Sequence, residues 1–523
     1  MKLSRKGACR FGAAALSLLA LVFAGGCRRP KPPAPVAKHI ILFIGDGMSL
    51  ASEIAASRYL YGHDRSLAWH PFAVRAYVAT WDVTAYDKNA KDEGRPPYRE
   101  AAFTPSLGYD PNREGRSPHP WDTLFPALPG APKTRPSVDS AAAATAMATG
   151  RKTASGCVSW LPDKSPEGRL RTIFEDYRET KGGAVGVVST VPFNHATPAP
   201  FVSHNISRTH YYAGYKEKPG TGIADEIIRE TRPDVVIGGG HPLLDNPGLD
   251  PDKGFISGAL LEELRTGREY VFVEREPGVD GGSALLAAAE RALAEGRKLF
   301  GLFGGPGGNF ETPVAADSPG SPSVARAGTE NPLLLDATLA ALRVLGRDPN
   351  GFFVMIEQGD IDWAHHDNDF GRMIGAMSDL EEAVRAAVAF VDMPGDAVDW
   401  TNTLLLVTAD HTTGLLRLDP GKPMGLGDLP RQERLSDEDL KAKRKAAGAG
   451  YVSKFVYPDG EVSYGTSGHA NELVTLSATG AGARLIVEYK GLWYPGPIID
   501  NTHVNAVLRR ALGLGPLPRG PLP

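Results

Sequence analysis

Carboxylate and imidazole side chains stand close together in the segment IEQGDIDWAHHDND, residues 356–369. Asp362 and His366 are four residues apart at the start of a predicted helix, so both side chains can face one ion, and Glu357 precedes them at the end of a predicted strand. This combination of oxygen and nitrogen donors suits zinc. The alternative interpretation is a solvated ion pair at i, i+4 spacing.

Two more apolar runs end on residues of the same types. Asp410 and His411 follow residues 404–407, and Asp46 follows residues 40–44 between two glycines that let the backbone approach an ion closely. Each of these alone could be a turn or a helix cap. Because several predicted strands end on such side chains, and parallel strands end at one edge of a sheet, the sequence predicts a metal centre at that edge.

A candidate nucleophile lies in the segment SVDSAAAATAMATG, residues 137–150. Ser140 follows Asp139 at the start of an alanine-rich helical pattern. A serine at a helix N-terminus lies beside free backbone N–H groups and the positive end of the helix dipole, which stabilise a bound phosphate and a serine alkoxide. The alternative is that Asp139 or Ser140 only caps the helix.

The elements that must position these residues are predicted from apolar runs and helical periodicity. Short runs that are apolar on both faces indicate buried parallel strands at residues 40–44, 184–188, 234–237, 352–356 and 404–407. Helical patterns lie between them at residues 140–149, 283–295, 331–345 and 371–391. This alternation predicts an α/β fold, with a doubly wound, mostly parallel central sheet and helices on both faces.

Three stretches interrupt the alternation and are predicted to be surface insertions that shape or cover the site. They lie near residues 84–136, 304–329 and 419–467, and the last includes the charged helical run LSDEDLKAKRKAA. We expect one catalytic domain over residues 38–514 and a short tail at residues 515–523.

Composition excludes several classes of protein. Of the 523 residues, 42% are hydrophobic and 23% charged, with 57 Lys+Arg against 61 Asp+Glu, which is typical of a globular chain. A strongly basic nucleic-acid binder is disfavoured, so we expect no nucleic-acid-binding module. No apolar stretch reaches the ~18 to 20 residues that a membrane-spanning helix needs.

The N-terminus is predicted to be a secretory signal. Basic residues precede the apolar run 11–23, which is too short to span a bilayer. The run ends in Ala24-Gly25-Gly26-Cys27, which resembles the lipobox of bacterial lipoproteins and predicts a lipid anchor at Cys27; the alternative is ordinary cleavage after Ala24. We therefore expect a signal at residues 1–27, a Pro-rich linker at residues 28–37, and a protein that is exported, either periplasmic or membrane-anchored.

Taken together, the motifs resemble those of the alkaline phosphatases. They occur in the family's order and span most of the mature chain: IGDGM at 44–48, DSAAAAT at 139–145, HATP at 195–198 with an arginine at 208, EQGDIDWAHH at 357–366, TADH at 408–411 and SGHANE at 467–472. The resemblance implies hydrolysis of small phosphomonoesters with release of inorganic phosphate, through a phosphoserine and with an alkaline optimum, by a homodimer.

The resemblance also assigns a role to individual residues. It implies that Ser140 is the nucleophile and that Arg208 binds the phosphate oxygens. It implies two zinc ions and one magnesium ion: Asp362, His366 and His469 for the first zinc, Asp46, Asp410 and His411 for the second zinc, and Asp46, Thr197 and Glu357 for the magnesium. Two cations held in this way could stabilise the attacking and leaving oxygens of an in-line displacement.

Two positions depart from the pattern of some family members. His195 stands where some members have Asp, and Trp363 where Lys or His is common. Both lie near the expected metal and phosphate positions, so they bear on metal preference and phosphate affinity. His195 could bind a metal directly or hydrogen-bond to its ligands.

Two other functions remain open at this stage. One is another hydrolase of the same superfamily, but sulfatases need a C/S-x-P-x-R context that Ser140 lacks, and phosphodiesterases commonly use Thr and lack the third metal site. The other is a catalytically silent, surface-tethered protein that binds metal or phosphate.

Overall fold

The five apolar runs form neighbouring strands at the centre of a ten-stranded sheet. The computed structural model describes residues 37–110, 137–242, 254–305, 307–395, 397–447 and 453–517. In spatial order the strands are β18 (Ile498–Asp500), β2 (Val74–Ala79), β17 (Val474–Gly480), β10 (Thr403–Thr408), β1 (His39–Gly45), β9 (Phe352–Gln358), β3 (Ala184–Pro192), β4 (Val235–Gly239), β6 (Lys298–Leu302) and β5 (Tyr270–Glu274).

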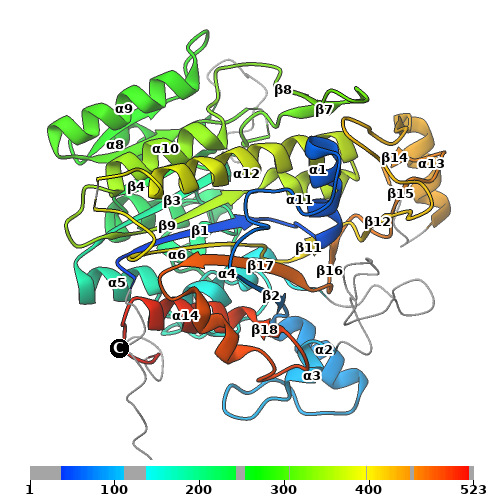
Figure 1. The fold of residues 1–523 in the computed structure, drawn as a ribbon. Coiled ribbons are helices and arrows are strands. Elements are labelled where there is room, and N and C mark those ends of the chain that lie inside the picture. The colour runs from blue at the N-terminus through cyan, green and yellow to red at the C-terminus, as the bar shows by residue number, and fades with distance from the viewer. Residues whose placement is uncertain are drawn as a thin grey trace, which may run out of the picture. The chain divides into compact units, whose positions relative to one another are not determined.

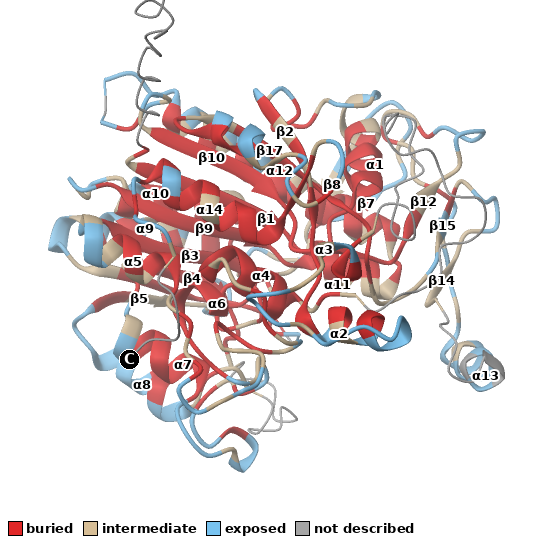
Figure 2. Cartoon of the chain, turned by 90° about the horizontal axis from the view of Figure 1, so that it is seen from below, coloured by how far each residue is buried: buried red, intermediate tan, exposed pale blue. Residues whose placement is uncertain are grey.

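One strand of this sheet runs against the others. β17 is antiparallel to both of its neighbours, β10 and β2, whereas every other neighbouring pair in the sheet is parallel. All residues of β1, β9, β3 and β10 are buried, which is why these strands are continuous apolar runs in the sequence. Figure 2 shows the same central strands as buried. The predicted mostly parallel α/β sheet is confirmed.

Helices cover both faces of the sheet. Figure 1 shows α9, α10 and α12 on one side and α5 and α14 on the other, and α10 and α12 pack directly on the central strands. The helices are α1 (Leu50–Tyr61), α2 (Val83–Asp92), α3 (Pro105–Gly108), α4 (Ser140–Thr149), α5 (Ile173–Lys181), α6 (Ala199–Val202), α7 (Ile223–Glu226), α8 (Gly258–Thr266), α9 (Gly281–Glu295), α10 (Leu334–Leu345), α11 (Asp360–Asp367), α12 (Phe370–Val391), α13 (Asp437–Ala447) and α14 (Asn501–Ala511).

The four predicted helices are present, with small shifts at their starts. The alanine-rich helix spans Ser140–Thr149, as predicted. α10 begins three residues later than its pattern suggested, because the carboxylate of Asp336 accepts a hydrogen bond from the backbone N–H of Leu333 and so caps the helix there.

The predicted insertions contain short elements where the structure describes them. α2 and α3 lie in the first stretch, whose residues 111–136 are outside the described part of the chain. The second contains the hairpin β7 (Val314–Ala316) and β8 (Ser323–Ala325), and the third contains β13 (Glu433–Arg434), the exposed helix α13, β14 (Phe455–Val456) and β15 (Val462–Tyr464), which pairs with β12 (Leu416–Leu418). Their assignment as insertions stays a prediction.

Residues 35–523 form one compact unit. The predicted signal at residues 1–27, the linker up to residue 36 and the tail from residue 518 lie outside the described residues. Among the helices that are described, none has both the length and the apolar character that crossing a bilayer requires.

Candidate active site

Three predicted metal ligands meet beyond the ends of β1 and β10. Asp46 follows β1, while Asp410 and His411 follow β10, the strand that pairs with β1. The Nε2 atom of His411 lies 3.4 Å from Oδ1 of Asp46 and 3.2 Å from Oδ2 of Asp410. One potential ligand atom from each residue lies within 4.8 Å of the other two, and all three side chains are buried. The structure therefore brings this set together.

Asp362 is the centre of a second group. His366, one turn further along α11, places its Nε2 3.1 Å from Oδ2 of Asp362, and Nε2 of His469 lies 3.7 Å from Oδ1. His469 reaches the group because β16 (His469–Ala470) pairs with β11 (Thr412–Thr413), which places it opposite Thr413. Asp362, His411 and His469 each place one potential ligand atom within 4.8 Å of the other two, and the two imidazole rings stack with centroids 3.6 Å apart. His366, the third residue of the predicted set, is more exposed.

Backbone carbonyl groups orient the imidazole rings of His366 and His469 in this second group. Nδ1 of His469 donates to the carbonyl of Val138 at 2.7 Å, and Nδ1 of His366 donates to the carbonyl of Ser467. Since each ring donates through Nδ1, its Nε2 is the nitrogen that faces Asp362 and that could bind a metal there.

A glycine turn joins the two groups. Gly47 has a φ of +71°, its N–H donates to Oδ1 of Asp410 at 3.2 Å, and a Cβ at this position would lie 2.8 Å from Cα of Asp362. Any side chain here would therefore force β1 and α11 apart.

A third group consists of oxygen donors. Oγ1 of Thr197 donates to Oδ2 of Asp46 at 3.2 Å, and Glu357, near the end of β9, accepts a hydrogen bond from Ser189 of β3. All four residues are buried. The arrangement provides carboxylate and hydroxyl oxygens close to the group that contains His411.

Ser140 is the first residue of α4 and contacts the first of these groups. Its Oγ lies 2.9 Å from Nε2 of His411, and Asp139 caps the helix by accepting a hydrogen bond from the backbone N–H of Ala141 at 3.0 Å. Asp139 is therefore the residue that caps the helix. The hydroxyl of Ser140 faces the metal-ligand cluster and remains the candidate nucleophile.

Arg208 contacts Asp139, the residue before Ser140, from a separate loop. Its Nη1 donates to Oδ1 of Asp139, and its Nη2 lies 3.4 Å from Nε2 of His195. The ring of His195 meets the ring of Trp363 edge to face, with centroids 5.9 Å apart. All twelve residues singled out in the sequence therefore belong to one connected cluster.

The carboxylates of this cluster repel one another. Burial raises the pKa of Asp46 well above its ordinary value, and the charge of Asp410 raises it further. Burial likewise raises the pKa of Glu357 to about 7 and that of Asp410 to about 8. For Asp362 burial also acts upward, but the neighbouring His366 outweighs it and holds the pKa well below the usual range. A cation among these groups would relieve the repulsion.

The histidines of the cluster also differ in the direction of their pKa shifts. Burial, together with His469, lowers the pKa of His411 far below its ordinary value, and burial lowers that of His469. Burial opposes a charge on His366 as well, but Asp362 raises its pKa to about 9. Burial and the charge of Arg208 lower the pKa of His195 to about 3, so its ring is neutral at neutral and alkaline pH.

The donor set fits the metals that the resemblance implies. Oδ1 of Asp46, Oδ2 of Asp410 and Oε1 of Glu357 are buried oxygens that take part in no hydrogen bond among the described residues. Such atoms are costly unless a cation binds them. The mixed carboxylate and imidazole groups suit zinc, and the group of Asp46, Thr197 and Glu357, which offers only oxygen, suits magnesium.

Sequence reasoning missed two residues that complete the cluster. Asp139 was recognised only as a helix cap, yet its second oxygen holds Arg208. Thr413 donates through Oγ1 to Oδ1 of Asp362 at 2.5 Å and lies 3.3 Å from Nδ1 of His411. Its place two residues after His411, at the end of the two-residue strand β11, is the available signal.

Comparison with known proteins agrees with these motifs. The family model described as "Alkaline phosphatase" matches residues 130–422, more than half of the chain. The chain belongs to the alkaline phosphatase family. It is 30% identical over 382 residues to alkaline phosphatase 3 of Bacillus subtilis (strain 168) and 31% identical over 281 residues to alkaline phosphatase 4 of the same strain. The matches cover 72% and 53% of this chain, and the chain spans 61% and 49% of those two relatives.

Solved alkaline phosphatases share the fold. The Thermus thermophilus enzyme superimposes with a TM-score of 0.59 at 21% identity, covering 95% of this chain and 96% of that one. A mutant of the alkaline phosphatase from the Antarctic bacterium TAB5, with aspartate in place of a histidine and magnesium bound in its M3 site, gives a TM-score of 0.54 at 20% identity, with coverage of 92% and 100%.

Proposed function

We propose that this chain hydrolyses phosphate monoesters through a phosphoserine on Ser140, at a site for two zinc ions and one magnesium ion, with an alkaline optimum. The observation that carries the proposal is the position of Oγ of Ser140, 2.9 Å from Nε2 of His411 and at the N-terminus of a helix. The family and the names of its relatives support the same reaction class.

The chain's own residues account for binding and attack. The positive end of the α4 helix dipole favours negative charge on Ser140 and on a phosphate beside it. Ser140 attacks phosphorus, the alcohol leaves, and water then releases inorganic phosphate from the phosphoserine. Arg208, held by Asp139, can bind two phosphate oxygens with its guanidinium throughout.

The proposed metal ligands follow the three groups of the cluster. Asp362, His366 and His469 would hold one zinc, Asp46, Asp410 and His411 the second zinc, and Asp46, Thr197 and Glu357 the magnesium. When bound, the cations would act as Lewis acids that stabilise the oxyanions of both displacement steps.

The test is turnover of p-nitrophenyl phosphate by the purified full chain across pH, with metal analysis of the same sample. We expect an alkaline optimum, loss of activity after chelation, and recovery when zinc and magnesium are returned. Full activity after exhaustive chelation with confirmed metal loss contradicts the metal mechanism. Faster hydrolysis of bis(p-nitrophenyl) phosphate favours a phosphodiesterase, and no turnover of either ester by metal-loaded protein leaves only a binding function.

We also propose that the protein is exported, anchored at Cys27, and works as a homodimer. The basic, apolar and small-residue pattern of residues 1–27 supports export and lipidation. Intact mass spectrometry of the mature protein should find a diacylglyceryl Cys27 at the N-terminus, in the membrane fraction. An unmodified Cys27 or a start at Gly25 contradicts the anchor, and a monomer by analytical ultracentrifugation contradicts the dimer.

A further inference from the structure

The loop that carries Arg208 is fixed by its backbone on one side. Asn205 and Val158 exchange N–H to carbonyl hydrogen bonds of 2.8 and 2.9 Å, and the N–H of Arg208 donates to the carbonyl of Gly156 at 2.7 Å. The N–H of Gly156 in turn donates to Oδ2 of Asp139 at 2.9 Å. These hydrogen bonds hold residues 205–208 against residues 156–158. The position of Arg208 therefore depends on the residue at which the chain enters this segment, residue 204.

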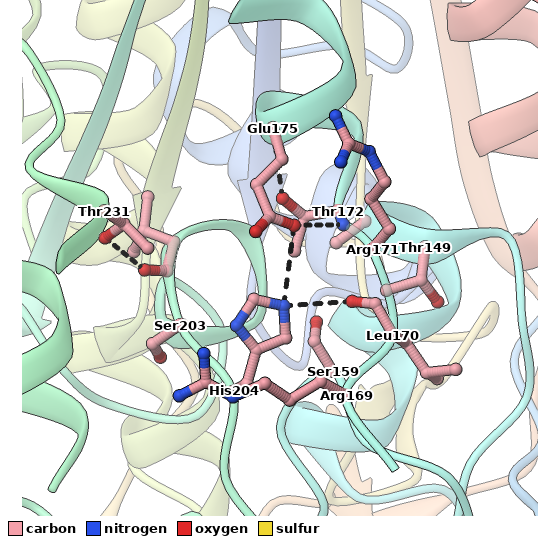
Figure 3. A network of polar contacts seen from close by, with 12 residues as sticks. Thr149, Ser159, Arg169, Leu170, Arg171, Thr172, Glu175, Ser203, His204 and Thr231 are labelled. Atoms are coloured by element: carbon pink, nitrogen blue, oxygen red, sulfur yellow. Dashed lines mark hydrogen bonds and ion pairs between the residues drawn. The ribbon is translucent and has the colours of Figure 1, made fainter. Parts of the chain in front are cut away.

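The entry to the loop is held by His204. One carboxylate, that of Glu226 at the end of α7, accepts two hydrogen bonds from it: from the backbone N–H at 2.9 Å and from Nδ1 of the ring at 2.7 Å. On the other side Nε2 lies 3.0 Å from the carbonyl of Leu170 and 3.5 Å from Oε2 of Glu175. Figure 3 shows the dashed lines from one ring nitrogen of His204 to both Leu170 and Glu175.

Both ring nitrogens of His204 face oxygens that can only accept. Carboxylate and carbonyl oxygens have no proton to donate, so the ring satisfies its surroundings only when both nitrogens carry hydrogen, as an imidazolium. Burial opposes this charge, but Glu175 and Glu226 outweigh it and raise the pKa of His204 to about 9. Arg169 contacts this pair, with its Nη1 3.6 Å from Oε1 of Glu226, and its Nη2 lies 3.5 Å from Oε2 of Glu230. The cavity that these residues line is also lined by the charged side chains of Arg171, Arg178 and Glu179.

We infer that His204 is a positioning residue for phosphate binding, because its buried imidazolium fixes the start of the 204–208 loop and thereby the guanidinium of Arg208. The inference rests on the proposed function, since it assigns phosphate binding to Arg208. His204 lies outside the metal-ligand groups, so its effect should pass through Arg208 alone. A buried, fully hydrogen-bonded ion pair of this kind is costly to break on one side, which makes it an effective anchor.

The test is a double-mutant cycle read out by inorganic phosphate as a competitive inhibitor of p-nitrophenyl phosphate turnover. His204→Gln removes the charge and one donor of the anchor. We expect its inhibition constant for phosphate and its KM to rise about tenfold, with kcat changed by less than about threefold. In an Arg208→Ala background the same substitution should have no further effect, because the group that it positions is gone. Glu290→Gln, which removes the charge of an exposed carboxylate paired with Arg343, is the control and should leave the inhibition constant unchanged.

Each outcome decides the inference. Independent, multiplying effects of the two substitutions, or an unchanged inhibition constant in folded His204→Gln, overturn it while the proposed function stands. If His204→Gln does not fold, Glu175→Gln decides, since it removes the charge at the longer contact while its amide oxygen can still cap α5 by accepting from the backbone N–H of Thr172. A rise of about two- to threefold over the control supports the inference, and a value equal to the control overturns it. No turnover by metal-loaded wild type overturns the proposed function, and the inference with it.

Discussion

Arg208 donates through Nη1 to Oδ1 of Asp139, the residue that caps the helix beginning at Ser140. The other oxygen of the same carboxylate accepts from the N–H groups of Ala141 and Gly156. Burial opposes ionisation of Asp139, but Arg208 outweighs burial and lowers its pKa. A single charged carboxylate thus fixes both the proposed nucleophile's helix and the proposed phosphate-binding group.

Removal of the guanidinium of Arg208 should weaken phosphate binding more than it slows the attack by Ser140. For Arg208→Ala we expect the inhibition constant for inorganic phosphate to rise ~10- to 100-fold, the equivalent of losing charge-assisted hydrogen bonds of ~1.5 to 3 kcal/mol. Arg510→Ala is a suitable control because Arg510 is exposed and, among the described residues, forms its ion pair with Glu488. Equal inhibition constants in the two variants would remove Arg208 from the phosphate site.

Replacement of Ser140 by alanine removes the hydroxyl that we expect to attack phosphorus. The phosphoenzyme should disappear and turnover should fall by ~10³-fold or more, although water can still leave a residual rate. Ser283 also lies in the first turn of a helix capped by an aspartate, so Ser283→Ala is the matched control and should keep full activity. Near-normal turnover of folded, metal-loaded Ser140→Ala would mean that Ser140 belongs only to the helix start.

The central strands could be predicted because burial on both faces leaves a continuous apolar run. β2, which lies next to the edge strand β18, could not, since its burial alternates over its first four residues and its sequence VRAYVA carries a charge. β17 could not be predicted either, because two of its first four residues, which are all buried, are Thr475 and Ser477 rather than apolar residues. These elements depend on their neighbours in the sheet rather than on a local pattern.

The site residues that lie at the ends of predicted strands could be found from the sequence. Asp46, Asp410 and Glu357 follow recognisable apolar runs, whereas His469 was assigned only through the resemblance. In the structure a pair of two-residue strands brings it opposite Thr413, and elements so short leave no periodicity in the sequence. His204 is likewise indistinguishable among 13 histidines until its two carboxylate partners are seen together.

His204 should make stability depend on pH. Its pKa of about 9 in the folded protein exceeds the ordinary 6.5, so the folded state binds the proton more tightly and is stabilised by it. The contribution, about 3 kcal/mol from this shift, is complete below pH ~6.5 and is lost as pH rises to ~9. The difference in unfolding free energy between wild type and His204→Gln, measured by urea at several pH values, should shrink over this interval. A difference that stays constant from pH 6 to pH 10 contradicts the prediction.

The last prediction concerns His195, which lies two residues before the proposed magnesium ligand Thr197. The ring is buried and neutral, and its Nδ1 has no hydrogen-bond partner in the described part of the chain. It offers nitrogen without negative charge, whereas magnesium prefers charged oxygen donors and keeps several waters. We therefore expect the wild type to need added magnesium for full activity.

Substitution of His195 can separate charge from shape. His195→Asp supplies a carboxylate and should bind magnesium more tightly than the wild type, while His195→Asn has nearly the same size as Asp without its charge and should gain much less. The measurement is a magnesium titration of each protein with its zinc sites filled, followed by direct metal analysis. If the charge acts on the metal, affinity should rank Asp above Asn and Asn at or near the wild type. Equal affinity in all three proteins would show that residue 195 does not tune this site, and equal gains for Asp and Asn would assign the effect to removal of the bulky ring beside Trp363.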